Sequence, residues 1–487
     1  MSGDKDRHKD KRPVGMVRFR HDLTLAVIQL FSIAAMTAVF GICWFVFYAE
    51  KIYIPFYFHG DWFVIALFSL IYFLLCNAYN AFDIRLQGFS ETIYSQTLSL
   101  FITDAIMFCV TCLLERRAAD IRPVLAMFVV HTAIAALWCL TTGKWYLVNF
   151  PPKRSAIIFG GREGIDSLID QYGLKNRFQV DFTMDTQTCI RDISVLKDVE
   201  TVFLSDVSSS ARNEILKYCV DNDIEVYVTP RIGDTIMRSA RQVHMFHLPV
   251  LQVGRYHPSP WYLLFKRCFD IVASGLALIV LSPFLLITAI AIKIDDGGPV
   301  FYTQDRLTKD GRIFKIHKFR SMRVDAERDG VARLSTGEND DRITRVGRFI
   351  RKTRIDELPQ LIDILRGDLS VVGPRPERPE IAAQYEESMP EFRLRLQAKA
   401  GLTGYAQVYG KYNTQPYDKL KMDLMYLANP SVMEDLKICF ATVKILFMSE
   451  STEGVAEGQI TAAVEEPHES KSSENKKITI ENSVYAK

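Results

Sequence analysis

The sequence predicts a membrane protein that combines transmembrane α-helices with α/β regions. Three observations predict this fold class. Residues 23–148 are dominated by long apolar runs, residues 155–255 alternate strand-like and helix-like segments, and residues 262–294 form a further apolar run that contains a proline. We therefore expect four transmembrane helices, a Rossmann-like α/β module, and a monotopic α/β domain that a re-entrant helix holds at the membrane.

The average composition conceals this division. Over 487 residues, hydrophobic residues make up 48% and charged residues 24%, values that suit two or three folded units. The formal net charge of +2 gives no reason to expect a nucleic-acid partner. Nine scattered cysteines fit a reducing compartment better than a disulfide framework, and we expect Cys109 and Cys112 to serve in packing.

The apolar runs at about 23–48, 62–82, 96–114 and 123–141 have the length of membrane helices. A helix needs ~20 apolar residues to cross the hydrocarbon core. Tryptophan and tyrosine residues cluster near the ends of these runs, as they do at membrane interfaces. Uncharged runs of this length make a soluble helical bundle the weaker interpretation.

Flanking charge predicts the orientation. The first 22 residues are rich in Lys and Arg, which predicts a cytoplasmic tail rather than a cleavable signal peptide. Four crossings then return the chain to the cytoplasm near Lys153 and Arg154. The predicted outside loop disagrees with this orientation, because it holds Arg116, Arg117 and Arg122.

A strand-like run, Ser155 to Phe159, opens the module at 155–255 and leads into a glycine-rich turn, Gly160 to Gly164. Residues 201–204 and 225–228 read as further buried strands with a helix between them, which predicts a parallel α/β fold. A glycine-rich turn after a first strand can hold a dinucleotide phosphate, but the spacing matches GxGxxG poorly. We expect a structural or regulatory module.

The apolar run at 262–294 is interrupted by Ser282 and Pro283. Proline removes a backbone donor and kinks or breaks a helix. A re-entrant helix that breaks here would keep both flanking regions in the cytoplasm, with Ser282 helping to satisfy the broken backbone. A kinked fifth crossing is the alternative that the sequence leaves open.

Residues 298–322 combine strand patterns with basic side chains. The turn residues Lys309, Asp310 and Gly311 lie between two strand-like runs and predict a β-hairpin. Lys315, Lys318 and Arg320 follow, and such a cluster beside a membrane could meet lipid headgroups, a pyrophosphate or only solvent. The charged stretch at 323–345 reads as a mobile loop.

Two adjacent acids, Asp356 and Glu357, precede apolar residues at helical spacing. Pro359 suits the first turn of this helix and Gly367 suits its end. Carboxylates are favoured at a helix N-terminus, and neighbouring acids point in different directions, so that one can attack while the other holds a metal ion. Two simple capping acids would give the same pattern.

A second polar motif, Gly373-Pro374-Arg375-Pro376, places an arginine between two prolines. The prolines fix the backbone around a planar side chain that binds oxyanions with two hydrogen bonds. Residues 399–404 form another turn of small residues, where a ligand could approach closely.

Together these segments resemble one family, the bacterial polyprenyl-phosphate sugar-1-phosphate transferases, or polyprenyl glycosylphosphotransferases. The resemblance runs from about Trp261 to Phe447, and the four preceding spans with the module match the long, membrane-anchored branch. It rests on the order and spacing of these motifs: Lys266-Arg267, Ser282-Pro283, Gly298-Pro299-Val300-Phe301, Lys318-Phe319-Arg320-Ser321-Met322, Asp356-Glu357-Leu358-Pro359-Gln360, Gly373-Pro374-Arg375-Pro376 and Gly401-Leu402-Thr403-Gly404. Leu307-Thr308 departs from the pattern, since many relatives have glycine there.

The resemblance implies a catalytic domain at 261–450 with the re-entrant helix at 262–294. Asp356 would be the nucleophile that attacks a UDP-sugar and expels UMP, and polyprenyl phosphate would capture the phospho-sugar aspartyl intermediate. Glu357 would bind Mg²⁺. Arg375, flanked by Pro374 and Pro376, would hold a substrate phosphate, with Lys318, Arg320 and Arg354 as further candidates.

The family also implies a bacterial plasma-membrane location, a cytoplasmic catalytic domain, a possible homodimer, and a role in initiating exopolysaccharide, capsule or O-antigen synthesis. Two rival hypotheses are a membrane-anchored nucleotide-sugar dehydratase or epimerase, for which Tyr417 and Lys421 have the required spacing, and a non-catalytic assembly scaffold. The tail at 451–487 should be disordered. The sequence does not identify the sugar.

Overall fold

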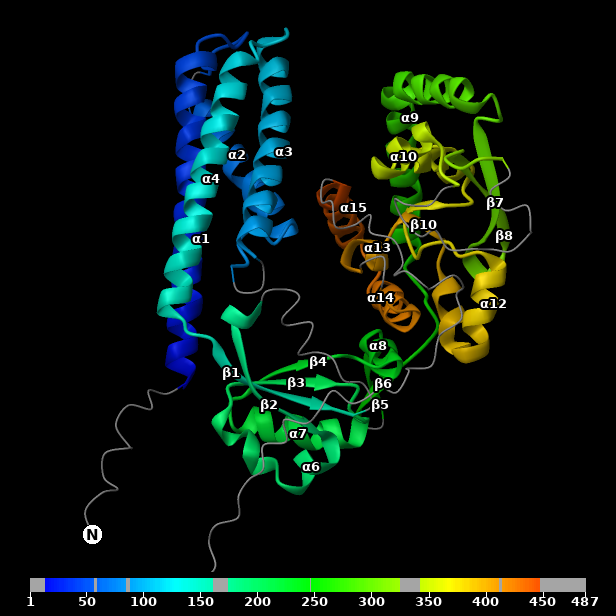
Figure 1. Cartoon of the computed structure of the whole chain (residues 1–487). Coiled ribbons are helices and arrows are strands. Elements are labelled where there is room, and N and C mark those ends of the chain that lie inside the picture. Colours follow the sequence, from blue (N-terminus) through cyan, green and yellow to red (C-terminus); the bar gives the residue numbers. More distant parts are fainter. Residues whose placement is uncertain are drawn as a thin grey trace, which may run out of the picture. The chain divides into compact units, whose positions relative to one another are not determined.

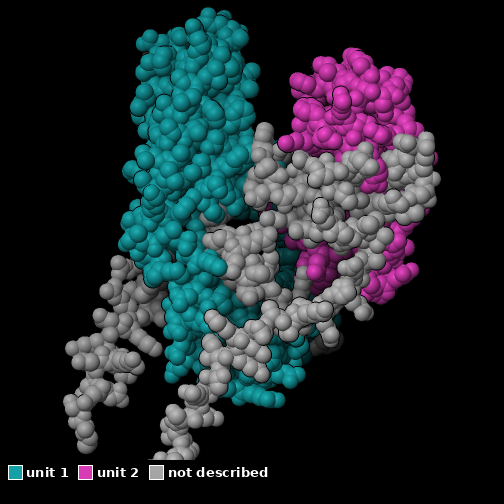
Figure 2. Space-filling model, in the orientation of Figure 1, with its two compact units in different colours: residues 1–266, 403–408, 424–449 teal, residues 267–402, 409–423, 450–487 magenta. Residues whose placement is uncertain are grey.

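The structure, a computed structural model, describes residues 14–56, 59–84, 88–160, 174–245, 247–324, 342–410 and 414–446. Two compact units make up the chain (Figure 2). Unit 1 is Met1–Lys266, Thr403–Val408 and Leu424–Ser449, and unit 2 is Arg267–Leu402, Tyr409–Asp423 and Glu450–Lys487. The predicted disordered tail, the glycines after Gly160 in the predicted turn, and most of the predicted loop at 323–345 lie outside the described residues.

Unit 1 begins with four long apolar helices (Figure 1): α1 (Val14–Cys43), extended by the π-helical turn η1 (Trp44–Tyr48), α2 (Gly60–Ala78), α3 (Phe89–Glu115) and α4 (Arg122–Asn149). All four are long and apolar enough to cross a membrane, as predicted. Large apolar side chains point outward, with Phe31 and Phe63 each 70% exposed. These helices fit a lipid environment, and α1 already begins within the predicted tail at 1–22.

Polar side chains lie inside this bundle as well as apolar ones. His131 is fully buried, and its Nδ1 lies 3.1 Å from Asp104 Oδ2 while its Nε2 lies 3.1 Å from the main-chain oxygen of Met36. The ring therefore connects α4 to α3 and α1. Phe68 of α2 stacks on it, with ring centroids 5.6 Å apart. Such contacts hold helices together where no water can satisfy polar groups.

The module that follows contains a four-stranded parallel sheet in the order β2-β1-β3-β4. Its strands are β1 (Lys153–Phe159), β2 (Phe178–Asp185), β3 (Thr201–Ser205) and β4 (Glu225–Val228). The helices α6 (Thr186–Arg191), α7 (Ser209–Asp221) and α8 (Ile232–Arg238) accompany them, with short 3₁₀ turns η2 (Leu174–Asn176) and η3 (Ile193–Asp198). The predicted parallel α/β fold is present, and β2 is a strand that the sequence pattern did not suggest.

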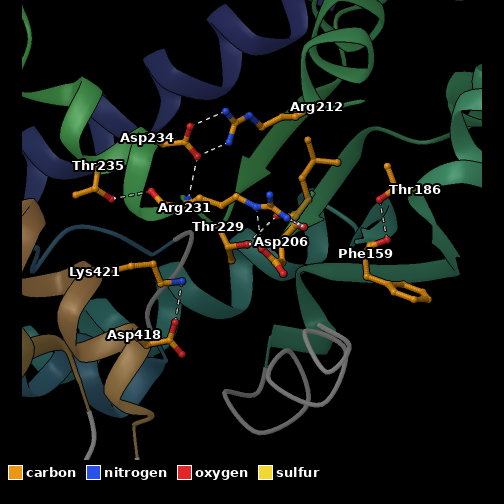
Figure 3. Close-up of polar contacts among 11 residues, drawn as sticks. Phe159, Thr186, Asp206, Arg212, Thr229, Arg231, Asp234, Thr235, Asp418 and Lys421 are labelled. Atoms are coloured by element: carbon orange, nitrogen blue, oxygen red, sulfur yellow. Dashed lines mark hydrogen bonds and ion pairs between the residues drawn. The ribbon is translucent and has the colours of Figure 1, made fainter. Parts of the chain in front are cut away.

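Charged residues follow the strands at the carboxyl edge of this sheet (Figure 3). Arg231 donates from Nε to Asp206 Oδ1 at 2.9 Å and from Nη2 to the main-chain oxygen of Asp206 at 2.6 Å. Arg212 pairs with both carboxylate oxygens of Asp234. These cations are neutralised by neighbouring acids, in keeping with a structural role for this edge.

The rest of unit 1 comes from two distant parts of the chain. The hairpin β5 (Arg241–Met245) and β6 (Leu248–Gln252) is antiparallel. The helices α13 (Tyr405–Tyr409) and α15 (Val432–Leu446) belong to this unit, and α15 packs on the apolar bundle. Lys444 of α15 pairs with Glu91 at 3.0 Å, and the rings of Phe440 and Tyr79 lie 5.8 Å apart.

The apolar run after the hairpin forms one long helix, α9 (Pro260–Asp296), which contains Pro283. Figure 1 shows α9 bent, with its C-terminal part turned away from the direction of its first part. Ser282 Oγ donates to the main-chain oxygen of Ile279 at 2.8 Å, next to the proline. This is the fifth helix, among the described residues, that is long and apolar enough to cross a membrane. The re-entrant course of α9 stays a prediction.

Unit 2 builds an α/β region onto α9. Its elements are β7 (Phe301–Leu307), η4 (Lys309–Gly311), β8 (Ile313–Phe319), α10 (Arg345–Lys352), η5 (Ile355–Glu357), α11 (Gln360–Arg366), β9 (Ser370–Val372), α12 (Pro379–Ser388), η6 (Pro390–Gln397), β10 (Gly401–Thr403) and α14 (Pro416–Ala428), the last two ending in unit 1. The strands β7 and β8 form the predicted antiparallel hairpin. Phe314 and Ile316 of β8 pack against Leu361 and Ile364 of α11.

Two polar residues of α9 fix this region to that helix. The guanidinium of Arg267 donates to the main-chain oxygens of Ile364 at 2.7 Å and Leu365 at 2.8 Å, which lie in the last turn of α11. Asp270 is buried and accepts hydrogen bonds from Ser370 Oγ and Val371 N, both at 2.9 Å. One turn of α9 therefore caps a helix and holds a strand.

The departure at Leu307-Thr308 has a structural explanation. Thr308 has an extended backbone (φ −126°, ψ −162°), so its position does not require glycine. Its buried hydroxyl donates to the main-chain oxygen of Asp368 at 3.1 Å and accepts from Ala400 N at 3.2 Å. The threonine thus supplies a bridge between two segments that glycine would lack.

Candidate active site

The predicted acidic pair lies in the 3₁₀ turn η5, immediately before α11. Arg354 precedes the turn with φ +56°, a left-handed conformation that is uncommon for a side chain of this size. This residue reverses the chain after α10 and directs Asp356 and Glu357 toward the hairpin. The helix α11 ends at Gly367, whose φ of +92° favours glycine, as the sequence predicted.

Glu357 lies among three basic side chains. Its Oε1 accepts from Lys318 Nζ at 3.1 Å and from Arg375 Nη2 at 3.3 Å, and its Oε2 lies 3.9 Å from Arg354 Nη1. Burial alone would raise the pKa of Glu357, but the charges of Lys318, Arg375 and Arg354 outweigh burial and lower it. Glu357 is therefore a permanent anion near neutral pH. The structure brings four predicted site residues together here.

Asp356 has a different environment, although it is the next residue. Its Oδ1 is buried and has no hydrogen-bond partner among the residues that the structure describes. Burial and the negative charge of Glu357 raise the pKa of Asp356 to about 6. One carboxylate of the pair is thus neutralised by cations, whereas the other is poorly solvated and has an unused oxygen. Such an oxygen is available for bonding to a ligand.

The segment around Arg375 is held by its backbone. The carbonyl of Pro374 accepts from Gly401 N at 2.9 Å, and the carbonyl of Pro376 accepts from Arg306 Nη1 at 3.0 Å. Gly373 lies so close to the chain at Lys399 that a Cβ would approach the Lys399 oxygen at 2.4 Å. The small residues at 399–404 therefore allow two parts of the backbone to meet, where the sequence had suggested approach of a ligand.

Behind this segment lies a buried ion pair that the sequence did not reveal. Arg395 is 4% exposed, donates to the main-chain oxygen of Arg375 at 2.9 Å, and pairs with Asp423 at 2.7 Å. Burial raises the pKa of Asp423 to about 6 despite the neighbouring Arg395. One signal in the sequence could have indicated this pair. Asp423 lies within the apolar helical pattern of Leu420, Leu424 and Leu427, and an acid that is buried in this way needs a charged or hydrogen-bonding partner.

The other predicted site residues have separate surroundings. Arg320 is 6% exposed and pairs with Asp296 at the end of α9, outside the group around Glu357. Ser282 and Pro283 lie within α9. Next to Lys318, the ring of His317 lies 2.6 Å from Asp363 of α11, and His317 N donates to the same carboxylate at 2.9 Å. This contact fixes β8 to α11 and thereby places Lys318.

The alternative pair Tyr417 and Lys421 lies on α14. Lys421 Nζ pairs with Asp418 at 2.8 Å (Figure 3) and lies 4.9 Å from the centre of the Tyr417 ring. A cation over a ring, balanced by an acid one turn away, explains the four-residue spacing by local helix packing.

The pair Asp356 and Glu357 also provides a donor set for a divalent cation. Among the described residues, no group of three or more His, Cys, Asp or Glu side chains could hold a metal ion. Mg²⁺, however, usually binds through one or two carboxylates and completes its shell with water and substrate phosphates. The Asp356 oxygen, which has no partner among the residues described, lies beside a second carboxylate and fits this mode of binding.

The fold and the site define a class of protein: an α/β protein with long apolar helices, paired carboxylates and a group of cations around one of them. The model of the bacterial sugar transferase family matches residues 261–449. Exopolysaccharide production protein PSS of Rhizobium leguminosarum bv. phaseoli is 44% identical over 203 residues, which are 39% of this chain and 98% of that protein. The chain belongs to the bacterial sugar transferase family.

Two longer relatives extend this comparison. UDP-N-acetylgalactosamine-undecaprenyl-phosphate N-acetylgalactosaminephosphotransferase of Aeromonas hydrophila is 38% identical over 234 residues, 47% of this chain and 54% of that protein. UDP-glucose:undecaprenyl-phosphate glucose-1-phosphate transferase of Escherichia coli K12 is 35% identical over 269 residues, 54% of this chain and 58% of that protein. The chain thus spans about half of the length of these two relatives.

Proposed function

We propose that the protein transfers a sugar 1-phosphate from a UDP-sugar to undecaprenyl phosphate at the cytoplasmic face of the bacterial plasma membrane. This step would initiate the synthesis of exopolysaccharide, capsule or O-antigen. The observation that carries the proposal is the division of labour within the acidic pair, in which Glu357 is neutralised by three cations while Asp356 keeps a buried oxygen without a described partner.

In the first step, a carboxylate oxygen of Asp356 attacks the sugar-side phosphorus of the UDP-sugar. The bond between that phosphorus and the bridging oxygen breaks, and UMP leaves with the oxygen. The product is a phospho-sugar ester of Asp356. In the second step, a phosphate oxygen of undecaprenyl phosphate attacks the same phosphorus and displaces the Asp356 carboxylate. A soluble anion and a lipid anion therefore never need to occupy the site together.

Basic side chains would assist both steps. Phosphoryl transfer depends mostly on positioning and on neutralising charge. Lys318, Arg354 and Arg375 already converge on Glu357 and can reorient toward a pyrophosphate. Their role would be to hold the donor phosphates so that the sugar-side phosphorus faces Asp356.

Glu357, with the free oxygen of Asp356 nearby, would hold Mg²⁺. The bound ion would neutralise pyrophosphate oxygens and so make UMP a better leaving group. The contacts of Glu357 with Lys318 and Arg375 would keep this carboxylate ionised and oriented before the ion and the donor arrive.

The membrane location follows from the apolar helices, and α9 would enter and leave the membrane on the same side. Its bend and its Ser282 contact support a re-entrant course, because a broken backbone at membrane depth needs such partners. A homodimer stays a prediction from the family resemblance.

The test uses the full-length protein in nanodiscs with undecaprenyl phosphate and Mg²⁺. UMP release is measured for UDP-glucose, UDP-galactose and their N-acetylated forms, for wild type, Asp356→Asn and Asp305→Asn. Asp305 is an exposed acid on β7 and serves as the matched control. We expect one sugar to support release in wild type and in Asp305→Asn, and at least a thousandfold loss in Asp356→Asn, of the order that loss of a nucleophile produces.

A second measurement separates the covalent route from direct transfer. Without acceptor, wild type should release one equivalent of UMP and retain a sugar label that hydroxylamine removes, as expected of an acyl phosphate. Asp356→Asn should retain no label. If UMP appears only when acceptor is present, transfer is direct and the role of Asp356 as nucleophile is wrong. If no UDP-sugar is consumed by folded wild type, the proposed activity itself is wrong.

A further inference from the structure

The interior of the helical bundle α1–α4 holds a carboxylate and an imidazole that the proposed chemistry does not use. Each of these helices packs on two of the others, so the four enclose a common interior (Figure 1). Asp104 of α3 is 3% exposed and His131 of α4 is fully buried there. Ionisable side chains inside a bundle of such apolar helices are rare and usually serve a function.

The contacts of His131 fix the number of protons on this pair. Its Nε2 lies 3.1 Å from the main-chain oxygen of Met36, which can only accept, so Nε2 carries a proton and donates it. Its Nδ1 lies 3.1 Å from Asp104 Oδ2, where two facing lone pairs would repel each other. One proton therefore lies between Nδ1 and Oδ2, on the imidazole or on the carboxyl group. In both forms the pair has no net charge.

The second oxygen of Asp104 is able to take up another proton. Oδ1 is buried and has no hydrogen-bond partner among the residues that the structure describes. A buried polar atom of this kind calls for a ligand or an ordered water. His131 is the described group whose charge acts on Asp104. The other helices contribute Cys43 of α1, on whose thiol Asp104 acts, and Phe68 and Tyr72 of α2, which stack on His131 and on each other.

Buried hydroxyl groups connect Asp104 with the end of the bundle where α3 begins. Thr103, Ser99, Ser95 and Thr92 are all buried, and their spacing of three or four residues places them on one face of α3. Thr103 donates to the main-chain oxygen of Ser99 at 2.7 Å, and Ser99 donates to that of Ser95 at 2.8 Å. A hydroxyl that donates in this way can still accept a hydrogen bond. The hydroxyls therefore offer a proton successive acceptors.

Toward the other end of α3 this line of hydroxyls is interrupted. Met107 is 1% exposed and lies between Asp104 and the next hydroxyl, that of Thr111. The more continuous route leads to the start of α3, where Glu91 pairs with Lys444 of α15.

We propose that Asp104 and His131 form a proton-binding site inside the bundle, which exchanges protons through the hydroxyls of α3 with the end of the bundle where that helix begins. The ligand is a proton because one carboxylate and one imidazole supply too few oxygen donors for a hard metal ion. On binding, a new O–H bond forms at Asp104 Oδ1, while His131 holds both of its ring protons and donates through Nδ1 to Oδ2. The pair then carries one positive charge. This site does not depend on the proposed function.

Infrared spectroscopy of the full-length protein in nanodiscs tests the site. Between about pH 8 and pH 5, the range in which histidine usually titrates, acidification of wild type should produce a carboxylic-acid band that Asp104→Asn lacks. Asp356 and Asp423, whose pKa values are raised to about 6, also take up protons in this range. Their bands are identified with Asp356→Asn and Asp423→Asn. If no band in this range belongs to Asp104, the pair only holds the helices together and the proposal is wrong.

Nitrogen NMR provides a measurement that needs no variant. The protein is labelled at histidine nitrogen and at phenylalanine carbon, and the signals of His131 are assigned through their proximity to the ring of Phe68. We expect both ring nitrogens of His131 to carry protons at about pH 5, the acid end of the usual histidine range. A proton-free Nδ1 at this pH would overturn the proposal.

Deuterium exchange of the Asp104 carboxyl group tests the route. Thr103→Val and Thr111→Val are matched, because both hydroxyls donate to the main-chain oxygen four residues earlier, at 2.7 Å and 2.8 Å. We expect Thr103→Val to slow the exchange at least about tenfold, the order of effect that loss of a buried hydrogen-bond partner produces. Thr111→Val should leave the rate unchanged. Slower exchange in Thr111→Val alone, or equal rates in both variants and wild type, would show that the assigned route is wrong.

Discussion

The guanidinium of Arg395 holds the main-chain oxygen of Arg375 at 2.9 Å while it pairs with Asp423 at 2.7 Å. A side chain that lies 4% exposed thus supports the backbone of a residue whose own side chain reaches Glu357. The side chain of Arg375 would therefore contact the substrate, whereas Arg395 only holds Arg375 in position.

Replacement of Arg395 by methionine should destabilise the protein and weaken donor binding. Loss of one partner of a buried ion pair typically costs about 3–5 kcal/mol, because the remaining charge is left unpaired. The double variant Arg395→Met, Asp423→Leu should regain stability but not the KM for the UDP-sugar. Denaturant unfolding and steady-state UMP release measure the two effects, with the exposed Arg393→Met as control. Recovery of KM in the double variant would assign Arg395 to stability alone.

The rate of UMP release should fall in acid. The pKa of Asp356 is raised to about 6, and in the proposed mechanism only the ionised carboxylate attacks phosphorus. We expect kcat/KM to be level above about pH 7 and to fall tenfold per pH unit below the pKa. Asp423 has a pKa raised to about the same value, so the profile is repeated in Asp423→Asn. If the fall of kcat/KM at low pH is absent in Asp423→Asn, that fall is caused by protonation of Asp423 and not of Asp356.

Asp356→Asn should be inactive yet more stable than wild type at neutral pH. A carboxyl whose pKa is raised in the folded state contributes stability when protonated, and that contribution is lost as the pH rises through about 6. Removal of the charge should therefore stabilise the protein by about 1–2 kcal/mol at pH 8, after allowance for partial exposure. The gain should vanish at pH 4. A variant that is less stable at pH 8 would contradict the unfavourable environment of Asp356.

Removal of divalent cations should abolish UMP release without unfolding the protein. Chelation leaves Glu357 paired with Lys318 and Arg375, so the fold keeps its contacts while the pyrophosphate loses its counter-ion. Glu357→Gln should raise the Mg²⁺ concentration that gives half-maximal rate by at least about tenfold. Thermal unfolding with and without chelator serves as the control. Full activity after chelation would show that UMP release does not require a divalent cation.

His131→Leu should loosen the apolar bundle. The ring connects Asp104 with the main-chain oxygen of Met36, and its loss leaves a buried carboxylate without this partner. Polar contacts between membrane helices contribute about 0.6–2 kcal/mol each. We expect a lower thermal midpoint in nanodiscs, and partial recovery in His131→Leu, Asp104→Leu. An unchanged midpoint in the single variant would show that the pair is not needed for stability.

The parts of the fold that local sequence determines were predicted well. Apolar runs identified the long apolar helices, the turn at Lys309 to Gly311 identified a hairpin, and Gly367 marked the end of α11. Each of these signals needs only neighbouring residues. The proximity of Asp356 and Glu357 was equally predictable, because consecutive residues are neighbours in any fold.

Contacts between distant residues were not predictable in this way. Lys318 and Arg320 are two residues apart, so an extended strand would place both on one face. The strand β8 ends at Phe319, however, and Arg320 pairs with Asp296 while Lys318 reaches Glu357. Similarly, nothing near Arg395 in the sequence indicates Asp423, because the pair depends on how η6 and α14 pack.

The contacts of Arg267 and Asp270 have a consequence for how the protein is made. A chain that starts after Asp296 would lack the cap on α11 and the acceptor for β9, so trimming away the membrane helix should not yield a stable soluble enzyme. During biosynthesis, α9 leaves the ribosome before β7 and everything that follows. Insertion of this helix would then come first and provide the surface on which the site assembles. On the proposed function, the newly made protein would have no finished site before α9 enters the membrane, and turnover would begin only where undecaprenyl phosphate is available.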